Sequence, residues 1–176
     1  MSGHNKFSKI KHKKAANDAA KSKVYGKYVR LITAEAKKAN GNLSSPGLQA
    51  AIERARKENM PNDTIDRAVK KAFEAGNIAM ENITYEAYGP GGCALIIEAL
   101  TENKNKAAAE IRHILSDHGT SLASVGSAVW AFKRVGQAWE PTTMTEISDE
   151  DGNKLGELIN ALEENDEVQE VFTNAE

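Results

Sequence analysis

The hydrophobic periodicity of this 176-residue chain changes near Gly76. Before that residue, apolar side chains recur every three or four positions, which is typical of amphipathic helices. After it, short apolar runs are separated by turn-forming residues, which is typical of strands, and two further helical patterns follow. The change predicts a helical domain followed by an α+β domain, because helices and strands bury their apolar residues in different kinds of layer.

Three helices are predicted before Gly76, over residues 17–40, 45–59 and 61–75. Each carries an apolar stripe on one side, so the three can bury one another and form a small helical domain over residues 17–78. The stripe of the third helix sets its apolar residues at i, i+4 and i+8, and we expect them to face inward: Ile65, Val69 and Phe73.

The rest of the chain, residues 79–176, is predicted to be an α+β sandwich with the element order ββαββαβ. Its strands are expected to form one mostly antiparallel sheet, with two helices covering one face. The tight turn 89–92, Gly-Pro-Gly-Gly, joins the first two strands. The expected elements are strands 83–88 and 93–100, helix 105–118, strand 127–133, an extended segment 137–148, a helix from residue 149 and strand 168–173.

Charge is divided unequally between these two parts. Residues 1–75 hold 17 Lys and Arg against 7 Asp and Glu, a net charge of +10, whereas the remaining residues hold 6 against 18, a net charge of -12. Residues 1–16 are rich in Lys and lack apolar periodicity, so we expect a flexible basic arm there. A cationic region on an otherwise acidic chain favours a polyanionic partner, and nucleic acid is the first candidate. The alternative is a solvated tail that only aids solubility.

The candidate nucleic-acid-binding residues are the cations and histidines of the arm and of the first helix. Every Lys or Arg that meets a phosphate releases a condensed counterion, so such a cluster would dominate affinity. They are His4, Lys6, Lys9, Lys11, His12, Lys13, Lys14, Lys21, Lys23, Lys27 and Arg30. A second, weaker contact is predicted where an aromatic ring borders the glycine turn and cations cluster near a helix start: Tyr88, Lys104, Lys106 and Arg112.

Other classes of function are disfavoured by the residues. The four histidines show no metal-ligand spacing, and the glycine turn lacks the Lys-Ser/Thr of a phosphate-binding loop. We find no nucleophile–base set, so we expect neither a cofactor nor catalysis. The lone Cys93 fits a small apolar residue in a reducing compartment. No apolar run reaches the roughly 20 residues that span a bilayer. We therefore expect a cytoplasmic protein without membrane contact and, in the absence of a heptad pattern, a monomer.

Motifs distributed over the whole chain carry a resemblance to a known family. They are Gly3-His4-x-Lys6-Phe7, Ile10-Lys11-His12-x-Lys14-Ala15-Ala16-x-Asp18, Asn59-Met60-Pro61, Tyr85-Glu86-x-Tyr88-Gly89-Pro90-Gly91-Gly92, Glu110-Ile111-Arg112-His113, Gly126-Ser127 and Val168-Gln169-Glu170-Val171. In these motifs the chain resembles the YebC/PmpR family of probable transcriptional regulatory proteins, which includes the mitochondrial translational activator of cytochrome oxidase. The resemblance implies a non-enzymatic regulator of gene expression. It also implies a third module inserted near residues 135–137, which this chain lacks.

The family resemblance implies two alternatives, DNA-binding transcriptional regulators and translation factors that engage the ribosome. The residues favour the second, because a Lys-rich arm beside a small basic helical domain suits irregular RNA that is read by shape and phosphate. We therefore expect a translation factor that engages ribosomal RNA. Helix 45–59 also carries Gln49, Arg54 and Arg56, so a reader of duplex DNA is the alternative.

Overall fold

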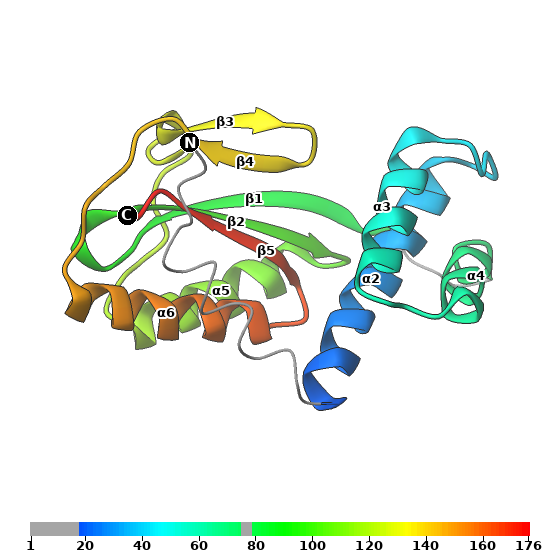
Figure 1. Ribbon diagram of the computed structural model, residues 1–176, viewed down its shortest axis with the longest axis horizontal. Coiled ribbons are helices and arrows are strands. Elements are labelled where there is room, and N and C mark those ends of the chain that lie inside the picture. Colours follow the sequence, from blue (N-terminus) through cyan, green and yellow to red (C-terminus); the bar gives the residue numbers. More distant parts are fainter. Residues whose placement is uncertain (1–17, 75–78) are drawn as a thin grey trace. The chain divides into compact units, whose positions relative to one another are not determined.

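A computed structural model describes residues 18–74 and 79–176 of the chain. The described residues fall into two compact units, a helical unit that ends at Glu81 and an α+β unit from Asn82 to Glu176. Figure 1 shows the three helices of the first unit and the strands and helices of the second. The predicted mixed α+β class is confirmed. Within the described residues, no helix combines the length and the apolar character needed to cross a bilayer.

The helical unit consists of α2 (Asp18–Lys38), α3 (Pro46–Lys57) and α4 (Asn62–Lys71). Helix α2 packs against both of the others. Many of the buried residues are alanines, which let helix backbones approach closely but bury little apolar area each. The buried apolar residues of the three helices are Leu31, Ile32, Ala34, Ala36, Leu48, Ala51, Ile52, Ala55, Ile65 and Ala68.

The inward stripe predicted for the third helix is partly wrong. Ile65 is buried, but Val69 is only half-buried and the side chain of Phe73 is 55% exposed. Helix α4 ends at Lys71, so Phe73 lies beyond its last turn, and the small residues Ala68 and Ala72 occupy the buried side.

The turn between α3 and α4 contains the sequence motif Asn59-Met60-Pro61. Asn59 adopts a positive φ of 60°, a conformation that Asn tolerates better than most residues. The hydroxyl of Tyr25 donates to the carbonyl oxygen of Asn59 at 2.8 Å, Met60 is buried, and Pro61 is the N-cap residue of α4. The segment Asn59-Met60-Pro61 thus sets the turn between two helices.

The α+β unit has the predicted element order ββαββαβ. The first two strands and β5 form a three-stranded sheet in the order β1-β2-β5, in which β2 and β5 are antiparallel. The short connection between β1 and β2 makes that pair antiparallel as well, because parallel strands need a long crossover. The elements are β1 (Glu81–Tyr88), β2 (Ala94–Thr101), α5 (Lys104–Asp117), β3 (Phe132–Val135), β4 (Ala138–Pro141), α6 (Asp149–Glu164) and β5 (Val168–Thr173).

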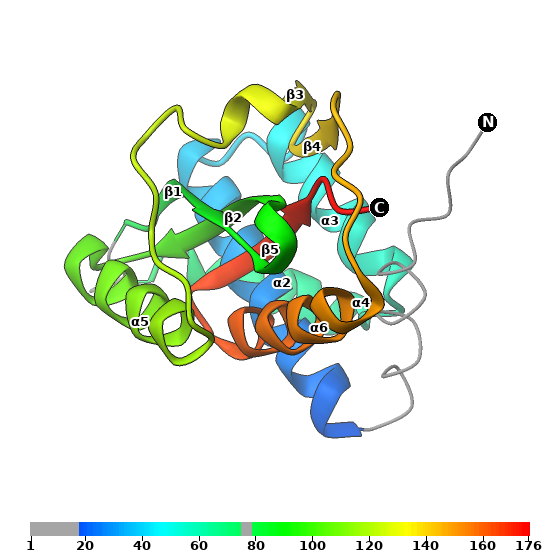
Figure 2. The same ribbon diagram turned by 90° about the vertical axis from the view of Figure 1, so that its left-hand side faces the viewer.

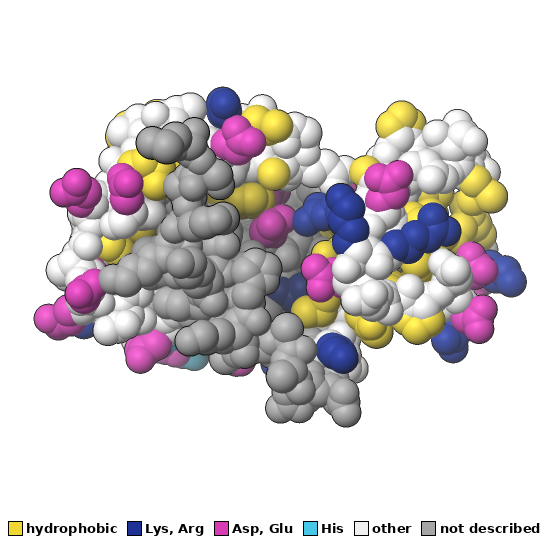
Figure 3. Space-filling model, viewed as in Figure 1, with side chains coloured by type: hydrophobic (Ala, Val, Ile, Leu, Met, Phe, Trp, Pro, Cys, Tyr) yellow, Lys and Arg dark blue, Asp and Glu magenta, His cyan; other side chains and the backbone are white. Residues whose placement is uncertain are grey.

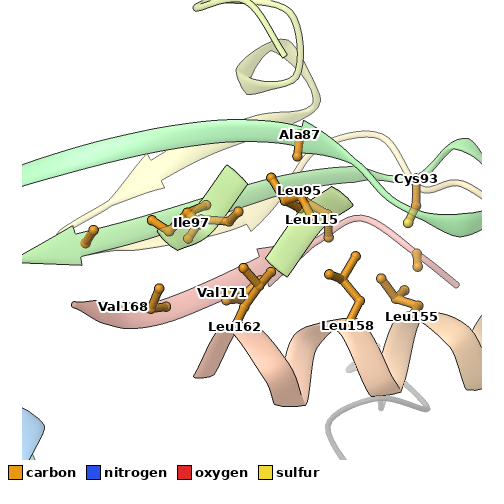
Figure 4. Close-up of a cluster of buried hydrophobic side chains, with 13 residues drawn as sticks. Ala87, Cys93, Leu95, Ile97, Leu115, Leu155, Leu158, Leu162, Val168 and Val171 are labelled. Atoms are coloured by element: carbon orange, nitrogen blue, oxygen red, sulfur yellow. The ribbon is translucent and has the colours of Figure 1, made fainter. Parts of the chain in front are cut away.

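The main core lies between one face of this sheet and helices α5 and α6. Figure 4 shows three leucines of α6 pointing toward the strands: Leu155, Leu158 and Leu162. They meet side chains of β2 and β5 and two side chains from α5, Ile111 and Leu115. All five of these α5 and α6 residues are fully buried. This is the two-helix layer that the sequence predicts.

The five strands do not form the single predicted sheet. Strands β3 and β4 pair only with each other, as a two-stranded sheet, and with the short helix η2 (Val129–Ala131) they cover the second face of the main sheet. The predicted strand 127–133 is accordingly wrong at its start, because β3 begins only at Phe132. The backbone amides just before it donate to the buried Glu86 carboxylate instead of to a strand.

Candidate nucleic-acid interface

The predicted site residues within the described chain begin on helix α2. Lys21 and Lys23 are exposed, whereas Lys27 and Arg30 are half-buried. Lys23, Lys27 and Arg30 follow the spacing i, i+4 and i+7, so they share one side of the helix. The structure therefore places these three cations along one side of α2, where the buried Leu31 follows Lys27 by four residues.

The seven predicted residues of the arm lie outside the described residues. They are His4, Lys6, Lys9, Lys11, His12, Lys13 and Lys14.

The helix dipoles account for some of the cations on the three helices. Lys37 and Lys38 end α2, Arg54, Arg56 and Lys57 end α3, and Lys70 and Lys71 end α4. Positive charge is favourable there, because the C-terminus of a helix carries partial negative charge. Lys21 and Lys23 instead lie in the N-terminal half of the described part of α2, away from that C-terminus.

Figure 3 shows most of the visible Lys and Arg side chains on the helical unit, while the visible charged side chains of the α+β unit are mostly Asp and Glu. Lys21 and Lys23 lie outside the last turns of the three helices, so the helix dipoles do not account for them.

The second predicted cluster is largely engaged within the protein. The ammonium of Lys106 lies 3.3 Å from the carboxylate of the buried Glu167 and 3.7 Å from that of Glu110. The hydrogen bond to Glu167 and the charge of that carboxylate raise the pKa of Lys106. Lys106 therefore neutralises a buried carboxylate. Its neighbours Lys104 and Arg112 are exposed.

Tyr88 does not join those cations. Tyr85 lies on the face of the sheet that α5 covers, and its hydroxyl donates to the carbonyl oxygen of Lys104 at 3.4 Å. Side chains three positions apart on a strand point to opposite faces. Tyr88 accordingly lies on the other face, where its hydroxyl donates to the carbonyl oxygen of Ser127. The predicted second contact is thus divided between two faces of one sheet.

Helix α3 carries the side chains that favoured a DNA reader, and two of them make contacts within the helical unit. The amide of Gln49 donates to the carbonyl oxygen of Leu43 at 2.6 Å, and the guanidinium of Arg56 donates to the side-chain oxygen of Asn62 at 3.4 Å. Arg54 is half-buried. Gln49 and Arg56 thus each use an N–H donor within the helical unit.

The glycine turn between β1 and β2 has a structural explanation. Gly91 has a φ of 72°, and a side chain there would come within 2.6 Å of Ile147. A side chain at Gly89 would meet Cys93 and Leu155 at 3.0 and 3.1 Å. Gly89 and Gly91 let the turn pack against Leu155 of α6 and Ile147 before it. Gly92 has space around it but a φ of 76°, so its backbone conformation favours glycine.

Glu86 is an important residue that the sequence reasoning passed over. Its side chain is buried, and its carboxylate accepts backbone N–H groups from Gly126, Ala128 and Val129 at 2.6, 2.7 and 2.8 Å. Burial alone would raise the pKa of Glu86, but these three hydrogen bonds prevail and lower it. The sequence held no signal for this burial, since an acid that alternates with apolar residues in a strand, as in Tyr85-Glu86-Ala87, is expected on the solvent face.

Among the described residues, no three His, Cys, Asp or Glu side chains are grouped so that they could hold a metal ion.

Comparison with protein families gives matches over nearly the whole chain. Residues 5–75 match the model of the TACO1/YebC protein N-terminal domain. Residues 80–138 and 137–175 match the model of the TACO1/YebC second and third domain. The two pieces of this second match meet at the two-residue turn between β3 and β4.

Individual relatives agree with these matches. A probable transcriptional regulatory protein of Fervidobacterium nodosum is 37% identical over 235 aligned positions, covering 99% of this chain and 93% of the relative. One of Desulfosudis oleivorans is 41% identical over 184 positions, covering 100% of this chain and 72% of the relative. The crystal structure of a conserved hypothetical protein of Aquifex aeolicus superposes with a TM-score of 0.80 at 28% identity, covering 90% of this chain and 91% of the other.

Proposed function

Because this chain belongs to the TACO1/YebC family, we propose that it is a non-enzymatic, nucleic-acid-binding regulator of gene expression. Its relatives are named probable transcriptional regulatory proteins, which supports the general class. The proposed contact runs along α2 through Lys21, Lys23, Lys27 and Arg30 and continues into the basic arm. The favoured partner is ribosomal RNA, so that the protein acts in translation, and duplex DNA is the alternative partner.

The observation that supports this proposal most is the group of cations on the N-terminal half of the described part of α2. The dipoles of α2, α3 and α4 explain the cations in their last turns, but they do not explain Lys21 and Lys23, which are exposed. A phosphate backbone would explain them, because each cation that meets a phosphate releases a counterion.

RNA is favoured over duplex DNA by what α3 offers. Specific reading of a major groove needs side chains such as Gln and Arg directed at base edges. In this chain Gln49 and Arg56 hydrogen-bond within the helical unit. Contacts made by lysines, in contrast, read the backbone and shape of a folded RNA without selecting a base.

We also propose that the third module of the family is missing between β3 and β4. The alignment with the Fervidobacterium relative spans 235 positions, although this chain has only 176 residues. The strand ladder closes from Phe132–Pro141 to Val135–Ala138, which leaves Gly136 and Gln137 as the turn. An inserted domain can leave and re-enter at such neighbouring points.

The proposal is tested by sedimentation of the whole chain with ribosomes at physiological salt. We expect the wild type in the ribosomal fraction and the variant Lys21→Glu/Lys23→Glu at least about tenfold depleted from it. The matched control is Lys133→Glu/Lys154→Glu, which changes net charge equally on the α+β unit and should sediment as the wild type does. Free protein in every case, or equal loss in both variants, would contradict the ribosomal role.

Affinity for DNA duplexes distinguishes the RNA partner from the DNA alternative. A transcriptional regulator should bind a defined duplex about a thousandfold more tightly than a random duplex. Equal affinity for the two duplexes, together with ribosome binding, supports the translation factor. A strong preference for one duplex in the absence of ribosome binding would replace it with the DNA-binding alternative.

A further inference from the structure

The turn between α2 and α3 contains a pair of residues whose chemistry makes it prone to spontaneous modification. Asn40 is followed by Gly41, and this is the one Asn-Gly pair in the chain. Both residues are exposed, in the connection that Figure 1 draws from the end of α2 to α3. The backbone nitrogen of a residue that follows Asn can attack the side-chain amide carbon of that Asn, and glycine obstructs the approach least because it has no side chain. The sequence alone therefore points to deamidation at this pair.

The structure leaves room for this attack. Asn40 and Gly41 both have a positive φ, of 47° and 87°, and a side chain built on Gly41 would meet no atom within 4 Å. The backbone hydrogen bonds of this turn use the N–H groups of Asn40 and Asn42. Among the residues that the structure describes, none forms a hydrogen bond with the N–H of Gly41 or with the side-chain amide of Asn40. Both reacting groups are thus exposed to water and able to turn toward each other.

Two other asparagines show what hinders the same reaction. Asn42 is exposed in the same turn, but it precedes a leucine, and its side-chain oxygen accepts the N–H of Ser44 at 3.0 Å. Asn59 has a similar positive φ of 60°, but the N–H of the residue after it donates to the carbonyl oxygen of Ala55 at 3.1 Å. A nitrogen whose hydrogen is bonded to a carbonyl is harder to deprotonate and is not free to turn toward the side chain.

The chain also has one Asp-Gly pair, Asp151-Gly152, which could close the same five-membered ring by losing water. This pair lies near the start of α6, the helix that Figure 2 shows beside α5 on one face of the three-stranded sheet. Ser148 holds both reacting groups there. Its carbonyl oxygen accepts the N–H of Gly152 at 2.8 Å, and its hydroxyl donates to the carboxylate of Asp151 at 2.9 Å. The fold therefore hinders at this pair the reaction that it permits at Asn40.

We propose that Asn40 is a site of spontaneous deamidation, through a succinimide that its side chain forms with the backbone nitrogen of Gly41. That nitrogen gives up its proton and bonds to the side-chain carbonyl carbon of Asn40. The bond from this carbon to the side-chain nitrogen breaks, and the nitrogen leaves as ammonia after taking up a proton. Water then opens the ring at either carbonyl, which gives aspartate or isoaspartate. Water is the only co-reactant that the reaction consumes.

Both products change the junction between α2 and α3. Each adds a negative charge two residues after Lys38, the last residue of α2, where the helix dipole disfavours an anion. Isoaspartate also adds one carbon to the main chain of the turn. Lys23 lies 17 residues before Asn40, which is about 25 Å along a helix, whereas exposed charges interact over roughly 8 Å at physiological salt. The modification should therefore weaken this junction and leave the proposed contact with nucleic acid unchanged, so the two proposals stand independently.

The first test incubates the whole chain at neutral pH and physiological temperature, folded and in parallel unfolded by guanidinium chloride. Peptide mass spectrometry detects the replacement of an amide by a carboxyl group, and methyl transfer by an isoaspartyl methyltransferase detects isoaspartate. We expect Asn40 to react in the folded chain at no less than about a third of its rate in the unfolded chain, and Asp151 to react at least about tenfold more slowly when folded, because a helical N–H is protected. Equal protection of the two pairs, or earlier deamidation of Asn42 or Asn59, would overturn the proposal.

The second test uses two variants of the same position. Asn40→Gly removes the amide and still adopts a positive φ, so it should fold as the wild type does and show no deamidation in this turn. A mass gain in the turn that persists in this variant would reject Asn40 as the site. Asn40→Asp carries the charge of one product, and we expect it to lower the melting temperature while affinity for nucleic acid stays as in the wild type. An unchanged melting temperature would contradict the proposed weakening of the junction between α2 and α3.

Discussion

The two units of this protein are stabilised in different ways. The helical unit buries mainly alanines with a few larger aliphatic residues, and its surface carries many cations. The α+β unit buries leucines and isoleucines between a sheet and two helices, and its surface is acidic. Larger apolar side chains contribute more free energy on burial than alanine does. The α+β unit therefore has the larger reserve of stability, while the helical unit holds the cations proposed to bind nucleic acid.

This comparison suggests a division between a scaffold and a binding surface. Cations on one unit and acids on the other separate the region that attracts phosphate from the region that repels it. Changes in the core of the α+β unit should then affect stability and leave affinity for nucleic acid alone, and changes on α2 should do the reverse.

The largest effect is expected from Leu158→Ala in α6. Leu158 is fully buried in the main core, so removing its side chain loses apolar burial and leaves a cavity. We expect the free energy of unfolding to fall by about 2–5 kcal/mol, measured by urea denaturation followed by circular dichroism. Leu43→Ala on the helical unit removes a 59% exposed side chain and should cost less than about 0.5 kcal/mol. A similar cost for both would mean that burial of Leu158 in the main core does not stabilise the α+β unit.

A smaller effect, dependent on pH, is expected from Glu86→Gln. The amide cannot match the carboxylate as an acceptor of three N–H groups, so at neutral pH we expect a loss of about 1–3 kcal/mol in the free energy of unfolding. The pKa of Glu86 is lowered in the folded protein, so its contribution is present above the ordinary pKa of a glutamate and is lost as pH falls through the lowered value. The difference between wild type and variant should therefore narrow on acidification.

Denaturation curves at several pH values check this expectation. Glu140→Gln is the control, because Glu140 lies in an exposed ion pair with Lys133 at 3.2 Å, and such pairs contribute little. A gap between wild type and Glu86→Gln that stays constant with pH would mean that the charge of Glu86 is not what holds the loop.

Two lysine substitutions distinguish a lysine that stabilises the fold from one that is proposed to bind nucleic acid. Lys106→Met leaves the buried Glu167 carboxylate without its ammonium partner, so we expect a lower melting temperature and unchanged affinity for nucleic acid. Lys21→Met should lower affinity and leave the melting temperature unchanged, because Lys21 is exposed at the start of α2. Differential scanning fluorimetry and filter binding measure the two quantities. Loss of affinity in Lys106→Met would mean that Lys106 also contacts nucleic acid.

The sequence predicts those features of the fold that depend on local patterns. The order ββαββαβ and the three helices follow from apolar spacing, and the strand of residues 168–173 agrees with β5 in both bounds. The apolar run 128–132 also resembles a strand, yet residues 129–131 form a 3-10 helix. The cause is Glu86, which lies about forty residues earlier. Its carboxylate accepts the backbone N–H groups of Ala128 and Val129, so these cannot pair with a neighbouring strand. A pattern within one segment cannot show such a distant hydrogen bond.

The same limit applies to the candidate site. Lys21 and Lys23 can be recognised from sequence as a cationic side of a helix, and the structure places them on the surface. Lys106 has the same charge and similar neighbours in sequence, but its partner Glu167 is 61 residues away. The sequence shows that a cation is present, but tertiary contacts decide whether it can bind a partner outside the protein.

The smallest effect, and the most direct measure of the binding surface, is the salt dependence of affinity. Each phosphate contact that is removed should lower the slope of log K against log salt by about 0.7 for a single strand and about 0.9 for a duplex. We expect a decrease of this size for Lys23→Ala and no decrease for Lys154→Ala, whose ammonium pairs with Glu150 at 2.7 Å on α6. Binding titrations from low to physiological salt give the slopes. An unchanged slope for Lys23→Ala would mean that α2 carries its cations for some reason other than phosphate, and an equal decrease for both lysines would mean that the acidic unit also contacts the backbone.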